Sequence, residues 1–301
     1  MGLINQLQKE FDNRNTQFRI IGKDLISRIQ REIQDNQDCH RGKADYNNYA
    51  DITYNFDILA DPTVKSIFVL ATPSPFYIFR IEGYPDLVLP PTYGDKNSNL
   101  KGINQITKDL FSQYGYNTYP VHLPKKLTAV RSGLAKYGRN AIAYVEGLGS
   151  YVNLTLFASD YPYGLQTPIS DDILMTACNK CGACIKKCPT KALDKDNVWL
   201  NFNFCITEMN ESEGVFPDWL KDEYHNSLMG CLFCQEVCPQ NKGKENKIVV
   251  PVTQKFINEI MIKKDFVDVD EEVRDVLEEH SIHIYFDVLK RNIEMLWKNK
   301  M

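Results

Sequence analysis

Eight of the nine cysteines in this chain lie between Cys178 and Cys238, and this crowding constrains the fold more than any other feature of the sequence. The chain has 301 residues and begins with MGLINQLQKEFDNRN, where a secretion signal would need a continuous apolar run. In a long chain without such a signal, clustered cysteines favour metal binding over disulfide bonds.

The cysteines form two runs of defined spacing. The first, Cys178-x2-Cys181-x2-Cys184-x3-Cys188-Pro189, has the bacterial ferredoxin spacing, in which three thiolates bind one four-iron–four-sulfur cluster and the fourth reaches a second. The second, Cys231-x2-Cys234-x3-Cys238-Pro239, is one cysteine short, and the isolated Cys205 supplies the missing ligand. The crossed pattern predicts two ligand sets, which are Cys178, Cys181, Cys184 and Cys238 for one cluster, and Cys188, Cys205, Cys231 and Cys234 for the other.

Structural zinc is the alternative, because paired CxxC elements also bind zinc. The complete CxxCxxCxxxCP spacing is far more specific than CxxC alone, so the sequence favours two clusters. Cys39 stands alone near the N-terminus and is expected to be a bystander thiol.

Composition and charge exclude some classes of partner. The chain is 43% hydrophobic and 25% charged, as soluble globular proteins are, and its net charge of −4 gives no overall attraction to nucleic acid or to an anionic membrane. No apolar stretch approaches the ~18 residues of a membrane-spanning helix. We therefore expect a cytoplasmic protein that makes no membrane contact.

The segment before the cysteines contains both helical and strand patterns. Apolar side chains recur every three or four residues from Phe18 to Ile33, which predicts an amphipathic helix. The apolar run 66–72 predicts a buried strand, and the Pro- and Tyr-rich stretch 74–93 predicts a long loop or a series of short pieces. A second amphipathic helix is expected over 103–114.

The later segments complete the predicted fold. Two apolar runs within 141–160 flank Gly147 and Gly149, which predicts a β-hairpin, and helical periodicity returns between Val276 and Leu296. The order of elements predicts an α/β (α+β) fold. Its predicted parts are a mixed-sheet α/β domain over 1–170, a double-cluster ferredoxin-like domain over 171–245 and a helical C-terminal segment over 246–301.

These motifs resemble a known superfamily. CNKCGACIKKCPTKAL (178–193) and GCLFCQEVCPQNK (230–242) resemble the double-cluster domain of cobalamin-dependent epoxyqueuosine reductases and reductive dehalogenases. AVRSGLAKYGRNAIAYVEGLGSYVNLTLFASD (129–160) resembles the corrinoid-domain segment of both, and FCITEMNESEGVFPDWLKDEYHNSLMGC (204–231) is similar to a shorter branch. The resemblance implies a nitroreductase-like α/β domain and a reductase in which a reduced ferredoxin- or flavodoxin-type donor feeds electrons through the clusters to a base-off cobalamin or related corrinoid.

The same resemblance implies where the corrinoid would lie. Gly138, Arg139, Asn140 and Ser150 would line its pocket. Glycine permits close backbone approach, and Arg and Asn side chains offer hydrogen-bond donors for amide or phosphate groups. Alternatively, Arg139 and Asn140 cap a helix and start a strand.

The resemblance also points to candidate proton donors. Epoxyqueuosine reductases have an Asp shortly before a Pro-Val pair, whereas NTYPVHLPKK (117–126) keeps Pro-Val and has no acid. Tyr119 and His122 are therefore the candidate catalytic residues. Their substrate would be a small molecule or a modified nucleoside.

The C-terminal stretch 268–280 is acidic, the opposite sign to a phosphate-binding surface, so we expect that tRNA is not the substrate. Two alternatives to an enzyme stay open. One is an electron-transfer or reductive-activator protein with two clusters and no substrate of its own. The other is a homologue in which the clusters serve only to stabilise the fold.

Overall fold

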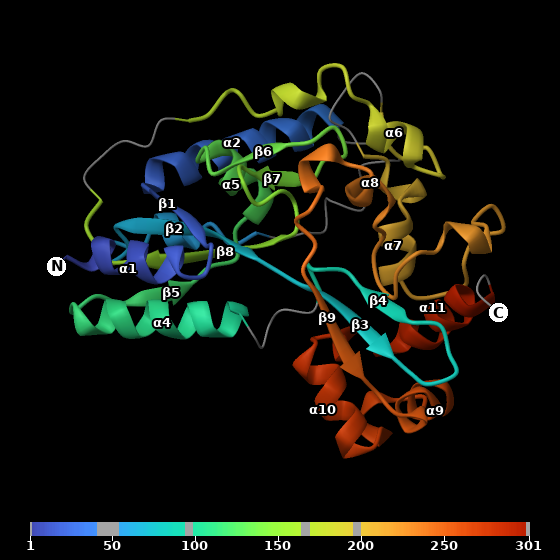
Figure 1. The fold of residues 1–301 in the computed structure, drawn as a ribbon. Helices are drawn as coiled ribbons and strands as arrows, with labels where there is room; N and C mark the ends of the chain where they lie inside the picture. The colour runs from blue at the N-terminus through green and yellow to red at the C-terminus, as the bar shows by residue number, and fades with distance from the viewer. Residues whose placement is uncertain (1, 41–53, 94–98, 164–168, 195–199, 299–301) are drawn as a thin grey trace. The chain divides into compact units, whose positions relative to one another are not determined.

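The computed structural model describes residues 2–40, 54–93, 99–163, 169–194 and 200–298. The chain divides into two compact units (Figure 1). Unit 1 comprises Met1–Pro73 and Gly102–Cys181, and unit 2 comprises Ser74–Lys101 and Gly182–Met301. This division differs from the three consecutive domains expected from the sequence, because residues 74–101 group with the later part of the chain.

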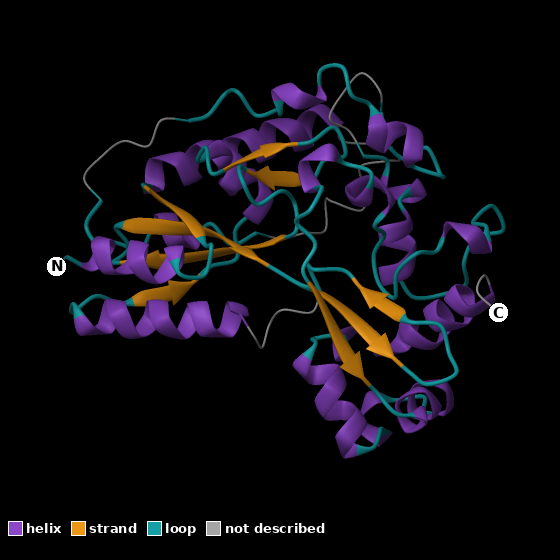
Figure 2. Cartoon of the chain, viewed as in Figure 1, coloured by secondary structure: helices purple, strands orange, loops and turns teal. Residues whose placement is uncertain are grey.

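Unit 1 is built on a four-stranded antiparallel sheet with the order β1-β2-β8-β5. Its strands are β1 (Gln17–Ile21), β2 (Ser66–Pro73), β8 (Val152–Ser159) and β5 (Thr118–Pro120). Helices cover both faces of this sheet (Figure 2). They are α1 (Leu3–Asp12) and α4 (Asn99–Gln113) on one face, and α2 (Lys23–His40) and α5 (Lys125–Arg131) on the other.

The strand predicted over 66–72 is confirmed as β2, and its alternation explains the two helical layers. Phe68 and Leu70 pack into the core with α1 and α4, whereas Ile67, Val69 and Ala71 pack into the core with α2 and α5. Successive side chains of a strand point to opposite faces. A strand buried on both faces therefore appears as one continuous apolar run.

Two predictions in unit 1 are partly wrong. Phe18 and Ile21 belong to strand β1, and the helix begins only at Lys23. The runs within 141–160 are strands, but they do not form a hairpin with each other. Strand β7 (Ala143–Val145) pairs with β6 (Ala135–Tyr137), and β8 pairs with β2 and β5.

Unit 2 contains a three-stranded sheet with the order β4-β3-β9. Its strands are β4 (Leu87–Leu89), β3 (Phe76–Arg80) and β9 (Lys247–Pro251), and β3 pairs with β9 in parallel. The stretch 74–93 is therefore a series of short pieces that includes two strands. Buried side chains of the sheet share one core with the C-terminal helices α9 (Gln254–Ile262), α10 (Glu271–Glu279) and α11 (Phe286–Lys298).

The cysteine segment of unit 2 has only short helices, namely α6 (Ala183–Lys187), α7 (Ile206–Glu211) and α8 (Phe233–Glu236). Short 3-10 turns complete the chain as η2 (Asp57–Leu59), η3 (Thr176–Cys178), η4 (Phe202–Phe204), η5 (Asp222–Tyr224), η6 (Pro239–Asn241), η7 (Phe266–Asp268) and η8 (His283–Tyr285). The predicted mixed α/β fold is confirmed. In the described part of the chain, no helix has the length and apolar character needed to cross a bilayer.

Candidate iron–sulfur site

Four cysteines of unit 2 form one of the two predicted ligand sets. Cys188 follows α6, Cys205 precedes α7, Cys231 lies shortly before α8, and Cys234 lies in its first turn. Burial raises the pKa of Cys205, which also interacts electrostatically with Cys188. Burial raises the pKa of Cys231 well above its usual value, and the neighbouring Cys234, Cys205 and Cys188 raise it further.

These electrostatic interactions indicate that Cys188, Cys205 and Cys234 lie near Cys231. Buried thiols that repel one another as thiolates are a costly arrangement unless a cationic centre compensates for the charge. An iron–sulfur cluster supplies that charge, so the four residues fit the group. All eight cysteines from Cys178 to Cys238 are free of disulfide bonds.

The other predicted set, Cys178, Cys181, Cys184 and Cys238, stays a prediction. Within the described residues, no three His, Cys, Asp or Glu side chains come close enough to hold a single metal ion. The side chain of Cys39, expected to be a bystander, lies outside the described residues.

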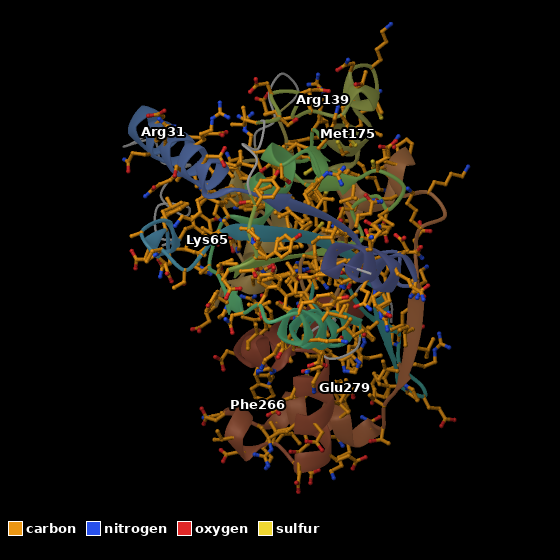
Figure 3. The ribbon with its side chains drawn as sticks, turned by 90° about the vertical axis from the view of Figure 1, so that its left-hand side faces the viewer. Arg31, Lys65, Arg139, Met175, Phe266 and Glu279 are labelled. Atoms are coloured by element: carbon orange, nitrogen blue, oxygen red, sulfur yellow. The ribbon has the colours of Figure 1, made fainter. Side chains whose placement is uncertain are left out.

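The loop that leads to Cys178 is attached to β6 of unit 1. Tyr137 donates its backbone N–H to the carbonyl of Ile173 at 2.6 Å, and Met175 donates its own to the carbonyl of Tyr137 at 2.9 Å. Arg139 follows, and its Nε donates to the carbonyl oxygen of Cys178 at 3.3 Å. Figure 3 shows Arg139 and Met175 on neighbouring segments of the chain. Arg139 therefore connects the β6–β7 turn to the first cysteine of the motif.

The other residues predicted to contact a corrinoid are mostly turned toward protein partners. A Cβ at Gly138 would lie 2.5 Å from Asn140 Oδ1 and 2.6 Å from Tyr144 Cε2, so only glycine fits there. Asn140 donates from Nδ2 to the Tyr144 hydroxyl at 2.9 Å. Ser150 is buried. Arg139 and Asn140 lie in the β6–β7 turn, so the alternative in which they cap a helix is wrong.

The two candidate proton donors line one hollow of about 770 Å³ in unit 1. Tyr119 lies on β5 and His122 just after it, and Asp57 and Asp61 are among the other residues that line the same hollow. The His122 ring lies 5.8 Å from the ring of Tyr54, whose pKa is raised by burial. Tyr54 was not predicted as part of this site, because nothing in its local sequence distinguishes it.

A carboxylate also lies beside the segment that has no acid in its sequence. Asn117 donates from its backbone N–H to Asp160 Oδ1 at 2.8 Å and from Nδ2 to Asp160 Oδ2 at 2.7 Å. Asp160 directly follows β8, which pairs with β5. Sequence reasoning missed this acid because the pairing of the two strands brings it there.

The chain beside Cys231 is held by a polar network in unit 2. The Tyr93 hydroxyl donates to the Glu211 carboxylate, and burial and that carboxylate raise the pKa of Tyr93 well above its usual value. Asn210 donates from Nδ2 to the carbonyl of Gly230 at 2.7 Å. Asn292, on α11, donates from Nδ2 to the carbonyls of Asn210 and Leu228 at 2.9 and 3.0 Å.

Comparison with known families agrees with the cluster motif. Residues 177–241 match the family described as the 4Fe-4S double cluster binding domain. The predicted double-cluster domain is therefore confirmed. The match favours iron–sulfur clusters over structural zinc at these cysteines.

Comparison with individual proteins extends the resemblance. An epoxyqueuosine reductase from Staphylococcus aureus is 35% identical over 121 residues, which are 40% of this chain and 30% of the relative. The chain thus spans about 30% of the length of the curated relative it matches. A selenomethionine-labelled epoxyqueuosine reductase structure aligns with a TM-score of 0.66 at 20% identity, over 98% of this chain and 80% of the other.

A second epoxyqueuosine reductase structure, solved with a tRNA-Tyr epoxyqueuosine-modified tRNA stem loop, has a TM-score of 0.65 at 21% identity and the same coverage. The predicted resemblance to epoxyqueuosine reductases is confirmed, and nearly the whole chain shares their fold.

Proposed function

We propose that this protein is an iron–sulfur reductase that passes electrons through two four-iron–four-sulfur clusters to a corrinoid, where a substrate is reduced. The cysteine spacing carries the proposal, because residues 177–241 match the 4Fe-4S double cluster binding domain and the spacing assigns Cys188, Cys205, Cys231 and Cys234 to one cluster. The remaining four cysteines would bind the second cluster. The likeness to proteins named epoxyqueuosine reductase supports a reductive function.

The corrinoid is the finer part of the proposal. When bound, it would supply the electron-rich metal centre that reacts with the substrate. Gly138, Asn140 and Ser150 are buried, so we assign them to the wall behind the group. Arg139 is half-buried and is the residue of the four that we assign to direct contact.

Tyr119 and His122 are proposed to supply the proton that a reduction consumes. Both side chains line the hollow beside β5, and an imidazole can give up a proton near neutral pH. Replacing His122 by Gln and Tyr119 by Phe keeps similar shapes while removing the donor. We expect each variant to lose about tenfold or more in turnover with an unchanged iron content.

The proposed substrate class is a modified nucleoside, since the relatives are reductases of such a group by name. Because helix α10 is acidic, we still expect that the substrate is not carried on tRNA. Activity assays on tRNA that contains epoxyqueuosine, and on the free nucleoside, decide between these two substrates.

The deciding experiment is anaerobic reconstitution with iron, sulfide and cobalamin, followed by gel filtration, absorbance and cobalt EPR. We expect cobalamin to co-elute with the protein and to give a base-off signal. If no cobalamin co-elutes while both clusters assemble, the corrinoid proposal is wrong, and the electron-transfer alternative takes its place.

A further inference from the structure

Two aromatic side chains are exposed together on unit 2. Phe204 and Trp219 are 43% and 39% exposed, and their ring centroids lie 5.2 Å apart. We call this pair the aromatic patch. Aromatic side chains are enriched at protein interfaces, and grouped exposed apolar residues mark interaction sites more often than single ones do.

The aromatic patch lies next to a cluster ligand. Phe204 ends η4 and directly precedes Cys205, whose own side chain is half-buried and interacts electrostatically with Cys188. The backbone turns tightly there, because Cys205 donates its N–H to the carbonyl of Phe202 at 2.9 Å. A molecule that covers Phe204 therefore comes close to the cluster that these cysteines hold.

Positive charge flanks two other ligands of the same set. Lys186 and Lys187 are exposed at the end of α6, immediately before Cys188. The Lys187 ammonium lies 5.3 Å from the centre of the Phe233 ring, and Phe233 directly precedes Cys234.

The opposite sign occurs beside Trp219. Asp218 and Glu223 are exposed there, and Lys221 is paired with Glu223 at 3.9 Å. The exposed lysines at the end of α6 carry the opposite sign to these acids. A surface that presents both signs orients a charged partner as well as attracting it.

We propose that the aromatic patch together with Lys186 and Lys187 is the docking surface of a small acidic electron-carrier protein. This inference rests on the proposed function, because it names the partner that reduces the cluster of Cys188, Cys205, Cys231 and Cys234. In the step, the carrier is oxidised by one electron and the cluster is reduced by one, and no bond forms or breaks. Transient electron-transfer complexes bury less than about 1,200 Å², so a few anchoring side chains are enough.

The test uses the full chain with reconstituted clusters, mixed anaerobically with a reduced acidic flavodoxin in a stopped-flow instrument. Cluster bleaching gives the second-order rate constant. For Phe204→Ala combined with Trp219→Ala, we expect this constant to fall about tenfold or more. Val267→Ala is the matched control, because Val267 is 75% exposed in the same unit and is expected to leave the rate unchanged.

Charge is tested separately. Lys186→Gln combined with Lys187→Gln should slow the reaction at low salt and flatten its dependence on ionic strength, because exposed charges act mainly on the association rate. These lysines are exposed, so this variant keeps the test valid even if the aromatic variant folds poorly. Reduction by dithionite, which needs no docking, should proceed at the parent rate in every variant.

An unchanged flavodoxin rate in both double variants would overturn the inference. So would an equal slowing with dithionite, because the substitutions would then act on the cluster itself. If the aromatic double variant lost binding to a tRNA stem loop while its flavodoxin rate stayed unchanged, the patch would be assigned to RNA instead. The assay needs neither corrinoid nor substrate, so failure of the proposed reductase function would be seen independently of it.

Discussion

Gly230 permits a close contact beside a cluster ligand, and adding one methyl group there tests the packing of the whole loop. The residue directly precedes Cys231 and has a φ of +62°, in the left-handed region. A Cβ at this position would lie 2.6 Å from Tyr93 Oη and 2.9 Å from Tyr93 Cε2. Tyr93 cannot simply swing aside, because its hydroxyl donates to Glu211 and its ring packs 5.8 Å from that of Tyr285.

The expected loss in the free energy of unfolding for Gly230→Ala has two parts. Alanine in a left-handed conformation costs about 1 kcal/mol, and overpacking against a held side chain costs about 1–3 kcal/mol more. Gly243 separates the two parts, since it has a φ of +73° in the same unit and a Cβ added there would meet nothing within 4 Å. Gly243→Ala should therefore cost only about 1 kcal/mol.

Anaerobic urea unfolding of the reconstituted chain, followed by cluster absorbance and circular dichroism, measures both variants. In a Tyr93→Ala background the obstacle is gone, so Gly230→Ala should then cost no more than Gly243→Ala. Equal losses for the two glycine variants in the parent chain would refute the reasoning, since Tyr93 would then be moving away without penalty.

Three further outcomes follow from unit 2. Cys205→Ala should lose about half of the bound iron, whereas Cys39→Ala should lose none; iron analysis decides. Asn292→Ala leaves two buried carbonyls without their donor and should cost about 2–4 kcal/mol in urea unfolding. Burial lowers the pKa of His225 from 6.5 to about 4. As the pH falls, His225 is therefore protonated in the unfolded chain before it is protonated in the folded chain. Stability should fall by about 2 kcal/mol from pH 6.5 to 4, and less in His225→Phe, as urea midpoints across that range would show.

The parts of the fold that were predictable from the sequence depend on local patterns. The cysteine spacing specifies its chemistry within a few residues, and the run that forms β2 is apolar because both of its faces are buried. The segment from Phe18 to Ile33 was ambiguous, because spacings of three and four also fit the end of a strand followed by a helix. Only pairing with β2, in which Phe18 faces Leu70, assigns Phe18 to a strand.

The parts that were not predictable depend on pairings between distant segments. Strand β3 pairs in parallel with β9, and Tyr77 faces Ile248 in this pairing. No local sequence pattern predicts that register. The pairing of β5 with β8 brings Asp160 to Asn117, so an acid that is absent from the local sequence is present in space. Pairing such distant segments costs loop-closure entropy. That cost is offset only when the complete core has packed.

The C-terminal helix shows why the double-cluster segment is more than a ferredoxin attached to another domain. Arg291, on α11, donates from Nη1 to the carbonyl of Gly214 at 2.6 Å and from Nη2 to that of Met209 at 2.9 Å. Its guanidinium also lies 3.9 Å from the centre of the Phe216 ring. The chain between Cys205 and Cys231 is thus fastened to a helix that the sequence indicated only as a terminal segment. Because that chain also carries Trp219, the same helix supports the segment on which we expect the electron donor to dock.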